Sequence, residues 1–291
     1  MIIVKLQGGL GNQMFQYAAG RRLAHLLGMD LKLDISGFEK DPLRNYALGA
    51  FNIVEHFASP DEVLSLSSEK LGMIARLTKR VLSAFSGLAR LHGKELNSHF
   101  DKGIRSVSEN VYLNGYWQSE KYFLDIEDII RKEFTVKYQQ TGKNLELYRN
   151  IASYESVSIH VRRGDYVTSP SANKILGVLD SDYYKRAIER LNKMLKEPQF
   201  IVFSDEPELV FDNLKLQCPT IVVAHNGQEK CYEDMRLMSQ CRHHIIANSS
   251  FSWWGAWLNP RKDAKIFAPK YWREDKNDES KDLIPKTWKR I

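Results

Sequence analysis

The chain has 291 residues, of which 43% are hydrophobic and 27% are charged, and its formal net charge is +6 at pH 7. This composition is that of an ordinary globular protein and excludes an intrinsically disordered chain, while the length favours two domains over one. The positive charge favours anionic ligands. We expect no nucleic-acid partner, because the sequence contains no long run of like charges and no nucleic-acid-binding module.

The first residues, the lack of a long apolar run and the cysteines together predict a cytoplasmic protein. The first residues, MIIVKLQ, lack the basic flank and long apolar stretch of a secretory signal. No apolar run is long enough to span a membrane. The three cysteines are odd in number and lack the spacing of a zinc or redox motif, so we expect reduced thiols.

The first part of the chain predicts a βαβ unit. A strand at residues 2–6 precedes a glycine-rich turn, a helix from about residue 12 to residue 27, and a short strand at residues 31–33. Residues 60–105 are mostly helical in pattern, and residues 111–116 predict a further strand. This order of elements is typical of the beginning of an α/β domain.

The glycine-rich turn could bring a ligand close to the backbone. Gly9 and Gly11 match the first two positions of a dinucleotide-binding fingerprint, but Met14 occupies the third position and Asp34 matches the ribose ligand only weakly. This departure argues against a nucleotide-dependent oxidoreductase. Glycines before a helix still permit close backbone approach, and the Asn12 amide could hydrogen-bond a ligand there.

The polar residues 139–144 predict a domain boundary, which we place between a lobe at residues 1–142 and a lobe at residues 143–291, although the short helix that follows could belong to either. Beyond the boundary, strands alternate with helical patterns. The predicted strands cover residues 157–161, 200–203, 220–223, 244–247 and 265–267. Such alternation predicts a parallel sheet with helices on both faces.

The first strand of the second lobe ends in a candidate anion site. Successive side chains of a strand alternate between faces, so His160 and Arg162 project together. Arg162, Arg163 and Asp165 would lie beyond the carboxyl end of the strand, where open α/β sheets bind ligands. Two adjacent guanidinium groups suit a diphosphate, although surface salt bridges are an equal alternative for this pair alone. The Arg-Gly-Asp tripeptide also occurs in adhesive proteins, but adhesion requires an exposed loop of a secreted protein.

A second candidate anion site follows the strand near residue 245. Asn248, Ser249 and Ser250 are good helix N-cap residues, and the amides of Ser249, Ser250 and Phe251 could bind an anion at the helix terminus. A capped helix without a ligand is the alternative. The helix carries tryptophans that we expect to pack in the core: Trp253, Trp254 and Trp257.

Two further sites in this lobe carry carboxylates. Ser204 and Asp205 follow the strand at residues 200–203, and Asp205 could accept hydrogen bonds from a ribose or a guanine, or cap the next helix. Asp180 and Asp182 resemble a metal-binding carboxylate pair. They directly precede an amphipathic helix, so capping is the better interpretation and we predict no metal site.

Four segments together closely resemble the α-1,2-fucosyltransferases of glycosyltransferase family 11. They are GGLGNQMFQYA at residues 8–18, HVRRGDY at residues 160–166, FSDE at residues 203–206 and IIANSSFSWWGAWLN at residues 245–259. Their order spans nearly the whole chain, and the combination of the second and fourth segments is very specific.

The resemblance implies a GT-B-like α/β fold, with two Rossmann-like lobes and a cleft between them. It implies that the second lobe binds GDP-fucose and the first binds the acceptor. The implied reaction is a metal-independent, inverting transfer of L-fucose to a hydroxyl, O2 of a terminal galactose, in the synthesis of a surface glycan such as an O-antigen. The alternatives are a GDP-fucose-dependent transferase of O- or α-1,6 type and a non-catalytic carbohydrate-binding protein.

The resemblance also implies roles for individual residues. Arg162 and Arg163 would meet the diphosphate beside His160, and Asn12 would face the reacting centre from the first lobe. The general base stays open between Asp165 and the departing phosphate. The residues expected to bind the donor are Arg162, Arg163, Gly9, Gly11, Asn12, Ser204, Asp205, Asn248, Ser249, Ser250 and Phe251.

An amphipathic stretch at residues 71–91 has two interpretations, contact with a membrane and packing over the core. Its apolar side chains alternate with arginines and lysines, so it could lie on an anionic membrane and bring the enzyme to a lipid-linked acceptor. Packing over the core is the interpretation that we favour.

Overall fold

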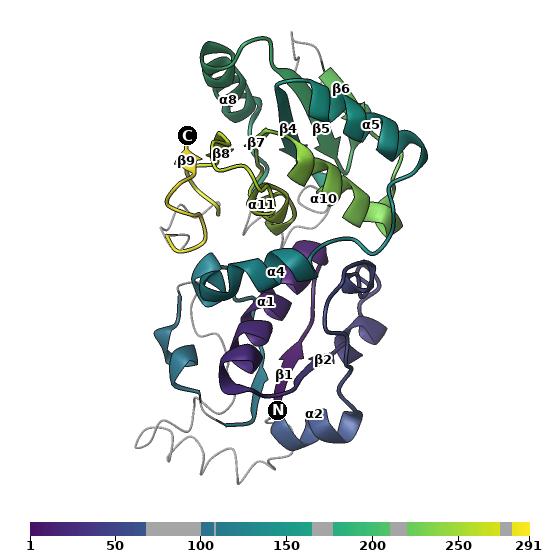
Figure 1. Cartoon of the computed structure of the whole chain (residues 1–291), viewed down its shortest axis with the longest axis vertical. Helices are drawn as coiled ribbons and strands as arrows, with labels where there is room; N and C mark the ends of the chain where they lie inside the picture. The colour runs from purple at the N-terminus through teal and green to yellow at the C-terminus, as the bar shows by residue number, and fades with distance from the viewer. Residues whose placement is uncertain (68–99, 108, 165–176, 210–219, 274–280) are drawn as a thin grey trace. The chain divides into compact units, whose positions relative to one another are not determined.

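A computed structural model describes residues 1–67, 100–107, 109–164, 177–209, 220–273 and 281–291 (Figure 1). These residues form two compact units, Met1–Lys137 and Tyr138–Ile291. The division falls shortly before the predicted boundary at residue 142, and it places helix α5 (Gly142–Ser153) in the second unit. The predicted cleft, and the assignment of acceptor and donor to different lobes, stay predictions.

The first unit is built on a three-stranded parallel sheet in the order β2-β1-β3. The predicted elements are present as β1 (Ile2–Lys5), α1 (Leu10–Leu27), β2 (Leu31–Asp34) and β3 (Val111–Leu113). Strand β1 is central, and its first three residues, Ile2, Ile3 and Val4, are completely buried, which explains the apolar run there. The sequence therefore located this sheet, with β3 shorter than predicted.

Smaller elements complete the unit. Helix α2 (Pro60–Leu66) begins with a capping box between Ser59 and Glu62, and α4 (Glu127–Glu133) lies beside α1. The α4 carboxylate of Glu133 accepts hydrogen bonds from Tyr17 at 2.6 Å and from Arg21 at 2.8 Å, which ties the two helices together. The short 3₁₀ helices of this unit are Ser36–Lys40, Leu48–Ala50, Lys102–Ser106, Glu120–Tyr122 and Leu124–Ile126.

Helix α1 lies against β1 so closely that only glycine fits at the contact. A Cβ atom added at Gly20 would be 2.1 Å from Cγ2 of Val4 and 3.2 Å from Cδ1 of Leu31. In a dinucleotide-binding fingerprint the third glycine serves this close packing. Here Met14 stands at that position, and Gly20, farther along the helix, provides the close approach.

The second unit contains a six-stranded sheet in the order β6-β5-β4-β7-β8-β9, with every neighbouring pair parallel. The strands are β4 (Ser156–Val161), β5 (Gln199–Ser204), β6 (Thr220–Val223), β7 (His243–Ile245), β8 (Ile266–Ala268) and β9 (Lys289–Arg290). The sequence predicted all of them except β9, which has only two residues. Along the chain the strands run outward from β4 to β6 and then from β7 to β9, so the order reverses between β4 and β7.

Helices cover both faces of this sheet, as predicted (Figure 1). Helix α8 (Ser181–Met194) packs on the face that carries Phe200 and Val202. Helices α5 and α10 (Cys231–Gln240) pack on the opposite face, against Ile201 and Phe203. Two short 3₁₀ helices, Pro207–Leu209 and Gln228–Lys230, complete this unit.

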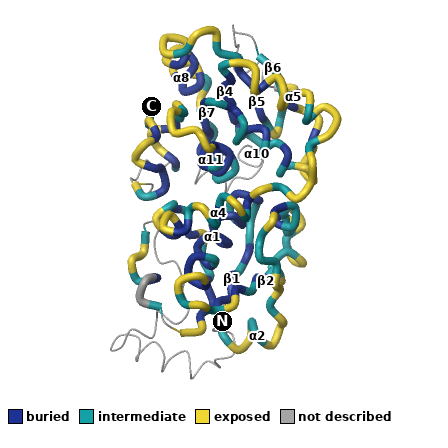
Figure 2. Tube along the Cα trace, in the orientation of Figure 1, coloured by how far each residue is buried: buried dark blue, intermediate teal, exposed yellow. Residues whose placement is uncertain are grey.

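Some side chains are buried although the sequence did not predict their burial. All six residues of β4 are buried, and Figure 2 shows the central strands in the buried colour. The sequence analysis assigned only Ile159 and Val161 to the core side of this strand. His160 is also buried, because helices enclose both faces.

Two predicted capping and packing roles are confirmed. The Asp180 carboxylate accepts a hydrogen bond from the Tyr183 amide at 2.7 Å and caps α8. In α11 (Ser250–Trp257) the tryptophans are buried, and the Trp253 indole donates to the Leu283 carbonyl at 2.8 Å.

A buried histidine links β4 to β7. Nδ1 of His244 lies 2.8 Å from the Ser158 hydroxyl, and Nε2 lies 2.7 Å from Nδ2 of Asn259. Because the Asn259 nitrogen can only donate, His244 carries its proton on Nδ1 and donates to Ser158. Burial, with a smaller contribution from His243, lowers the pKa of His244 from 6.5 to about 3. The imidazole is therefore neutral at physiological pH.

We expect Gly20→Ala to destabilise the first unit by about 1 to 3 kcal/mol, because the added methyl group overpacks the contact with β1. In a Val4→Ala background the obstructing methyl group is gone. The same change should then be neutral, or stabilising by up to about 1 kcal/mol from helix propensity. Urea unfolding of the four proteins measures this coupling, and strictly additive losses would contradict the packing argument.

Below pH 6.5 we expect stability to fall, because the unfolded state takes up a proton at His244 that the folded state does not accept until about pH 3. Each such histidine contributes a slope of up to about 1.4 kcal/mol per pH unit in that window. His244→Gln, which can keep both hydrogen bonds, should reduce the slope. Unfolding free energies at pH 7, 6 and 5 test this, and an unchanged slope would show that His244 is not the responsible group.

Candidate active site

The sheet topology brings three strand ends together. Val161 at the end of β4 pairs with Ser204 at the end of β5, and Ile159 pairs with Ile245 at the end of β7. Because all three strands are parallel, the residues that follow them lie at the same edge. This edge includes the reversal of strand order between β4 and β7, where doubly wound sheets bind their ligands.

The tip of β4 contacts the beginning of α11. The rings of His160 and Phe251 lie 5.5 Å apart between centroids, at an angle of 45°. The structure therefore brings His160 of the HVRRGDY segment next to Phe251 of the NSSFSWW segment, although the two residues are about 90 positions apart in the sequence. Their role in donor binding stays a prediction.

Both arginines after β4 face carboxylates that follow β5. Nη1 of Arg162 lies 3.2 Å from Oδ2 of Asp205, and Nε of Arg163 lies 3.4 Å from Oε2 of Glu206. The backbone amide of Arg163 also donates to Oδ1 of Asp205, at 3.0 Å. The Ser204 hydroxyl accepts a hydrogen bond from the Glu206 amide at 3.0 Å and so shapes the carboxylate-bearing turn. The turn is thus arranged around two ion pairs.

His160 lies beside these arginines as a neutral, buried group. Burial and the positive charge of Arg162 lower its pKa from 6.5 to about 3. Its Nδ1 atom has no hydrogen-bond partner among the residues that the structure describes. A neutral imidazole can donate or accept one hydrogen bond at each nitrogen, but it is too weak a base to hold an extra proton at neutral pH.

The beginning of α11 is capped as predicted. Ser249 is the N-cap residue, and its hydroxyl accepts a hydrogen bond from the Phe251 amide at 3.3 Å. An anion at this terminus would share the Phe251 amide with the cap. Asn248, only 2% exposed, donates to the carbonyls of Gly177 and Trp272 and fixes the loop before the helix.

The predicted residues of the glycine-rich turn lie in the first unit. Gly9 is the N-cap of α1 and Gly11 lies in its first turn. The turn requires a left-handed backbone at Gly8, with φ of 75°, and a Cβ there would be 2.7 Å from Nδ2 of the Asn12 side chain. The Asn12 side chain accepts a hydrogen bond from Gln118 at 2.8 Å. That Asn12 faces the reacting centre stays a prediction.

The structure gives Asp34 a structural role. Its carboxylate accepts hydrogen bonds from the Tyr112 hydroxyl at 2.6 Å and from the Ser36 amide at 3.0 Å, and the residue is 3% exposed. These contacts occupy the group that a dinucleotide-binding protein would use for a ribose, which weakens the oxidoreductase alternative further.

The sequence analysis missed three residues that hold the turns in place. Gln13 is fully buried, donates to the carbonyls of Gly8 and Asn45, and accepts from the Ala47 amide. The hydroxyl of Tyr184 donates to the His160 carbonyl at 3.1 Å, and that of Tyr183 donates to the Ile246 carbonyl at 2.7 Å. Both tyrosines lie in the amphipathic helix that the sequence predicted after Asp182, but only tertiary contacts show that they hold the tips of β4 and β7.

Three predictions lie wholly or mostly outside the described residues. Asp165, the candidate general base, and the amphipathic stretch at residues 71–91 are two of them. The third is the helical pattern at residues 60–105, of which the structure describes α2 and the 3₁₀ helix Lys102–Ser106.

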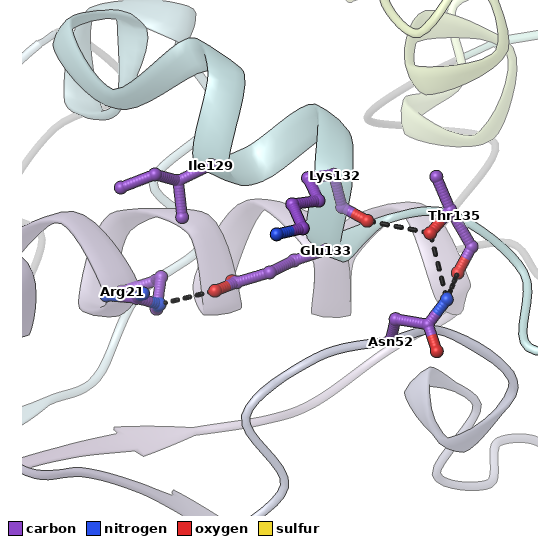
Figure 3. Close-up of a pocket in the computed structure, with 6 residues that line it drawn as sticks. All are labelled: Arg21, Asn52, Ile129, Lys132, Glu133 and Thr135. Carbon is purple, nitrogen blue, oxygen red and sulfur yellow. Dashed lines mark hydrogen bonds and ion pairs between the residues drawn. The ribbon is translucent and has the colours of Figure 1, made fainter.

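A pocket of about 450 Å³ lies elsewhere, between α1 and α4 in the first unit (Figure 3). Its lining residues are Arg21, Asn52, Ile129, Lys132, Glu133 and Thr135. None of the predicted donor-binding residues lines it. The hydrogen bonds of Glu133 to α1, and of Asn52 to Thr135 at 2.9 Å, give these side chains structural roles.

Within the described ranges, no group of three or more His, Cys, Asp or Glu side chains is arranged to hold a metal ion. Across the same residues, no helix has the length and apolar character needed to cross a membrane.

Comparison with characterised proteins places these motifs in context. The chain is 35% identical to an α-1,2-colitosyltransferase of Escherichia coli, over 100% of this chain and 99% of the relative. It is 33% identical to the O-antigen biosynthesis glycosyltransferase WbnK of Escherichia coli, over 92% and 93%. It is 28% identical to galactoside α-(1,2)-fucosyltransferase 2 of Sus scrofa, over 86% of this chain and 67% of the relative.

Solved structures support the fold. The fucosyltransferase NodZ from Bradyrhizobium matches with a TM-score of 0.53 and 15% identity, over 89% of this chain and 92% of that chain. NodZ α-1,6-fucosyltransferase co-crystallized with GDP matches with a TM-score of 0.52 and 16% identity, over 91% and 94%. Together with the two parallel sheets, these matches confirm the predicted GT-B fold class.

The family model described as glycosyl transferase family 11 matches residues 88–291, which include both ends of the β4–α11 contact. The resemblance that the motifs indicated is confirmed: the chain belongs to glycosyltransferase family 11 and is a glycosyltransferase.

Proposed function

We propose that this enzyme transfers L-fucose from GDP-fucose to O2 of a terminal galactose-type acceptor, with inversion and without a metal ion. The proposal includes a cytoplasmic location and a role in building a surface glycan such as an O-antigen. Whether the acceptor is lipid-linked is left open.

One observation carries the donor part of this proposal. Arg162 and Arg163 directly follow β4, and Phe251 in the first turn of α11 contacts His160 in the same strand, at the point where the strand order reverses. Guanidinium groups and helix N-terminal amides are both groups that bind phosphate oxygens. Their meeting at the ligand edge of the sheet suits the diphosphate of a nucleotide sugar.

The relatives support the sugar and the linkage. The names of the two relatives from Escherichia coli specify α-1,2 transfer of colitose in one case and O-antigen biosynthesis in the other. The relative from Sus scrofa is named for α-1,2 transfer of fucose to galactosides. GDP is present in the NodZ structure that shares this fold.

In the proposed reaction the acceptor oxygen attacks the anomeric carbon of fucose from the face opposite GDP. The bond between that carbon and the β-phosphate oxygen breaks, and its electron pair leaves with GDP. Inversion turns the β-linked donor into an α-fucoside. The acceptor proton passes to Asp165 or to the departing phosphate.

The protein's main task is then to stabilise the negative charge that develops on the β-phosphate. Preorganised donors at the position of developing charge supply the largest share of catalysis in many enzymes. Arg162 and Arg163 provide positive charge there, and the first turn of α11 adds backbone dipoles. His160, which is neutral, serves in this proposal as a hydrogen-bonding group and not as the base.

The similarity to an α-1,2-colitosyltransferase over the whole chain favours one second candidate, transfer of colitose from the corresponding GDP-sugar. A transferase of O- or α-1,6-fucosyl type would use the same donor site with another acceptor. A non-catalytic carbohydrate-binding protein would leave the two arginines at the ligand edge without a function.

Product analysis tests the proposed function directly. The enzyme is incubated with GDP-fucose or GDP-colitose and a panel of galactosides and N-acetylgalactosaminides, with magnesium or with EDTA. We expect an α-1,2-fucosylated galactoside in equal yield under both metal conditions. Preference for GDP-colitose would establish the second candidate, and loss of product in EDTA would overturn metal independence.

Arg162→Ala should lower the transfer rate about 100- to 1,000-fold, a cost of roughly 3 to 4 kcal/mol at the transition state, while the protein stays folded. Arg162→Lys should restore little of the activity, because an ammonium group lacks the planar fork of a guanidinium. Initial rates at saturating donor concentration provide the measurement.

Arg242→Ala is the matched control. Arg242 also pairs with a carboxylate, Glu155 at 3.5 Å, but at the amino-terminal edge of the same sheet. It should keep the parental rate. An Arg162→Ala enzyme that is folded and within about threefold of the parent would remove Arg162 from the mechanism.

A further inference from the structure

The carboxylate of Asp205 joins the turn after β4 to the turn after β5. Val161 and Ser204 are the last paired residues of the two strands, so Arg162 and Asp205 follow at the same level of the sheet. The two oxygens of Asp205 are divided between the Arg163 amide, at 3.0 Å, and the Arg162 guanidinium, at 3.2 Å. One side chain thus contacts both arginine residues of the candidate diphosphate site.

Gly164 is matched to this carboxylate. A Cβ atom on Gly164 would lie 2.4 Å from Oδ2 of Asp205 and 3.2 Å from its Cγ. These distances leave no room for a side chain while the carboxylate keeps its position. Gly164 does not have a positive φ, the backbone conformation that favours glycine at several other positions of the chain. The reason for a glycine here is therefore space for the carboxylate, not backbone conformation.

The ion pair is partly exposed to solvent. The side chains of Arg162 and Asp205 each keep 21% of their accessible surface. Solvent that reaches the pair screens it and limits its contribution to folding. Its geometry also affects where the guanidinium lies, because a carboxylate on one nitrogen orients a planar group that carries five N–H donors.

We propose that Asp205 is a positioning residue for the diphosphate site, which holds the Arg162 guanidinium and the Arg163 amide in place, and that Gly164 provides the space for it. The proposal rests on the proposed GDP-sugar donor. It differs from the expectation that Asp205 contacts the ribose or the guanine, because here the carboxylate acts through the arginine turn, to which both of its oxygens bind.

Affinity for GDP tests this role through a double-mutant cycle. Calorimetry on the full chain compares the parent, Asp205→Ala, Arg162→Ala and the double variant. Asp205→Ala should weaken GDP binding about tenfold by misplacing Arg162. The double variant should lose less affinity than the product of the two single losses, because the part of the Asp205 effect that acts through Arg162 is already gone and only the Arg163 amide remains to be released. Losses that multiply would overturn the positioning role and favour a direct contact between Asp205 and the nucleoside.

Gly164→Ala provides a second, independent cycle that leaves both charged groups in the chain. By displacing the carboxylate it should weaken GDP binding in the same direction as Asp205→Ala. In an Asp205→Ala background, where the obstructing carboxylate is gone, it should have almost no further effect. An undiminished effect in that background would contradict the proposed fit between Gly164 and Asp205.

Two measurements separate this proposal from the proposed function. Glu208→Ala, which removes an exposed carboxylate from the 3₁₀ helix just after Asp205, should bind GDP like the parent, and a loss equal to that of Asp205→Ala would indicate a general charge effect. A parent protein that does not bind GDP would overturn the proposed donor, and with it this role. Multiplying losses in a parent that does bind GDP overturn the positioning role alone.

Discussion

The parallel pairing of β4 with β7 is the constraint on which the rest of the candidate site depends. These strands lie next to each other although α8, β5, β6 and α10 come between them in the chain. Because the strand order reverses there, α8 and α11, the described helices that follow β4 and β7, pack on opposite faces of the sheet. The arginine turn and the N-terminus of α11 meet at the carboxyl-terminal edge of the sheet because the backbone ladder fixes both.

Buried polar groups reinforce this pairing where apolar packing alone would not select one register. His244 bonds Ser158 across the two strands, and the hydroxyls of Tyr183 and Tyr184 bond carbonyls near the strand tips. If β4 and β7 paired one residue out of register, these polar groups would lose their hydrogen bonds while still buried, at a cost of several kcal/mol. The polar contacts therefore specify the relative position of the two tips on which an anion would lie.

The electrostatics of the site follow from the same enclosure. Burial keeps His160 neutral, so the local positive charge comes from the two guanidinium groups and from the dipole of α11. Carboxylates after β5 pair with both guanidinium groups, and in our proposal they fix the geometry in which a diphosphate would meet these groups. The charge that would stabilise the leaving group is thus held in place by neighbouring strands.

The sequence by itself determined the family, the alternation of strands and helices, and the segments that carry the chemistry, because periodicity and motifs are local properties of the chain. It also predicted one helix N-cap within residues 180–182 and another within residues 248–250, since capping depends on a few adjacent residues. Only the tertiary structure decided the strand order, the burial of His160, the packing role of Gly20 and the contacts of Asp205 and Gly164. These depend on which distant segments become neighbours in space, and hydrophobic periodicity identifies a buried face without specifying what will cover it.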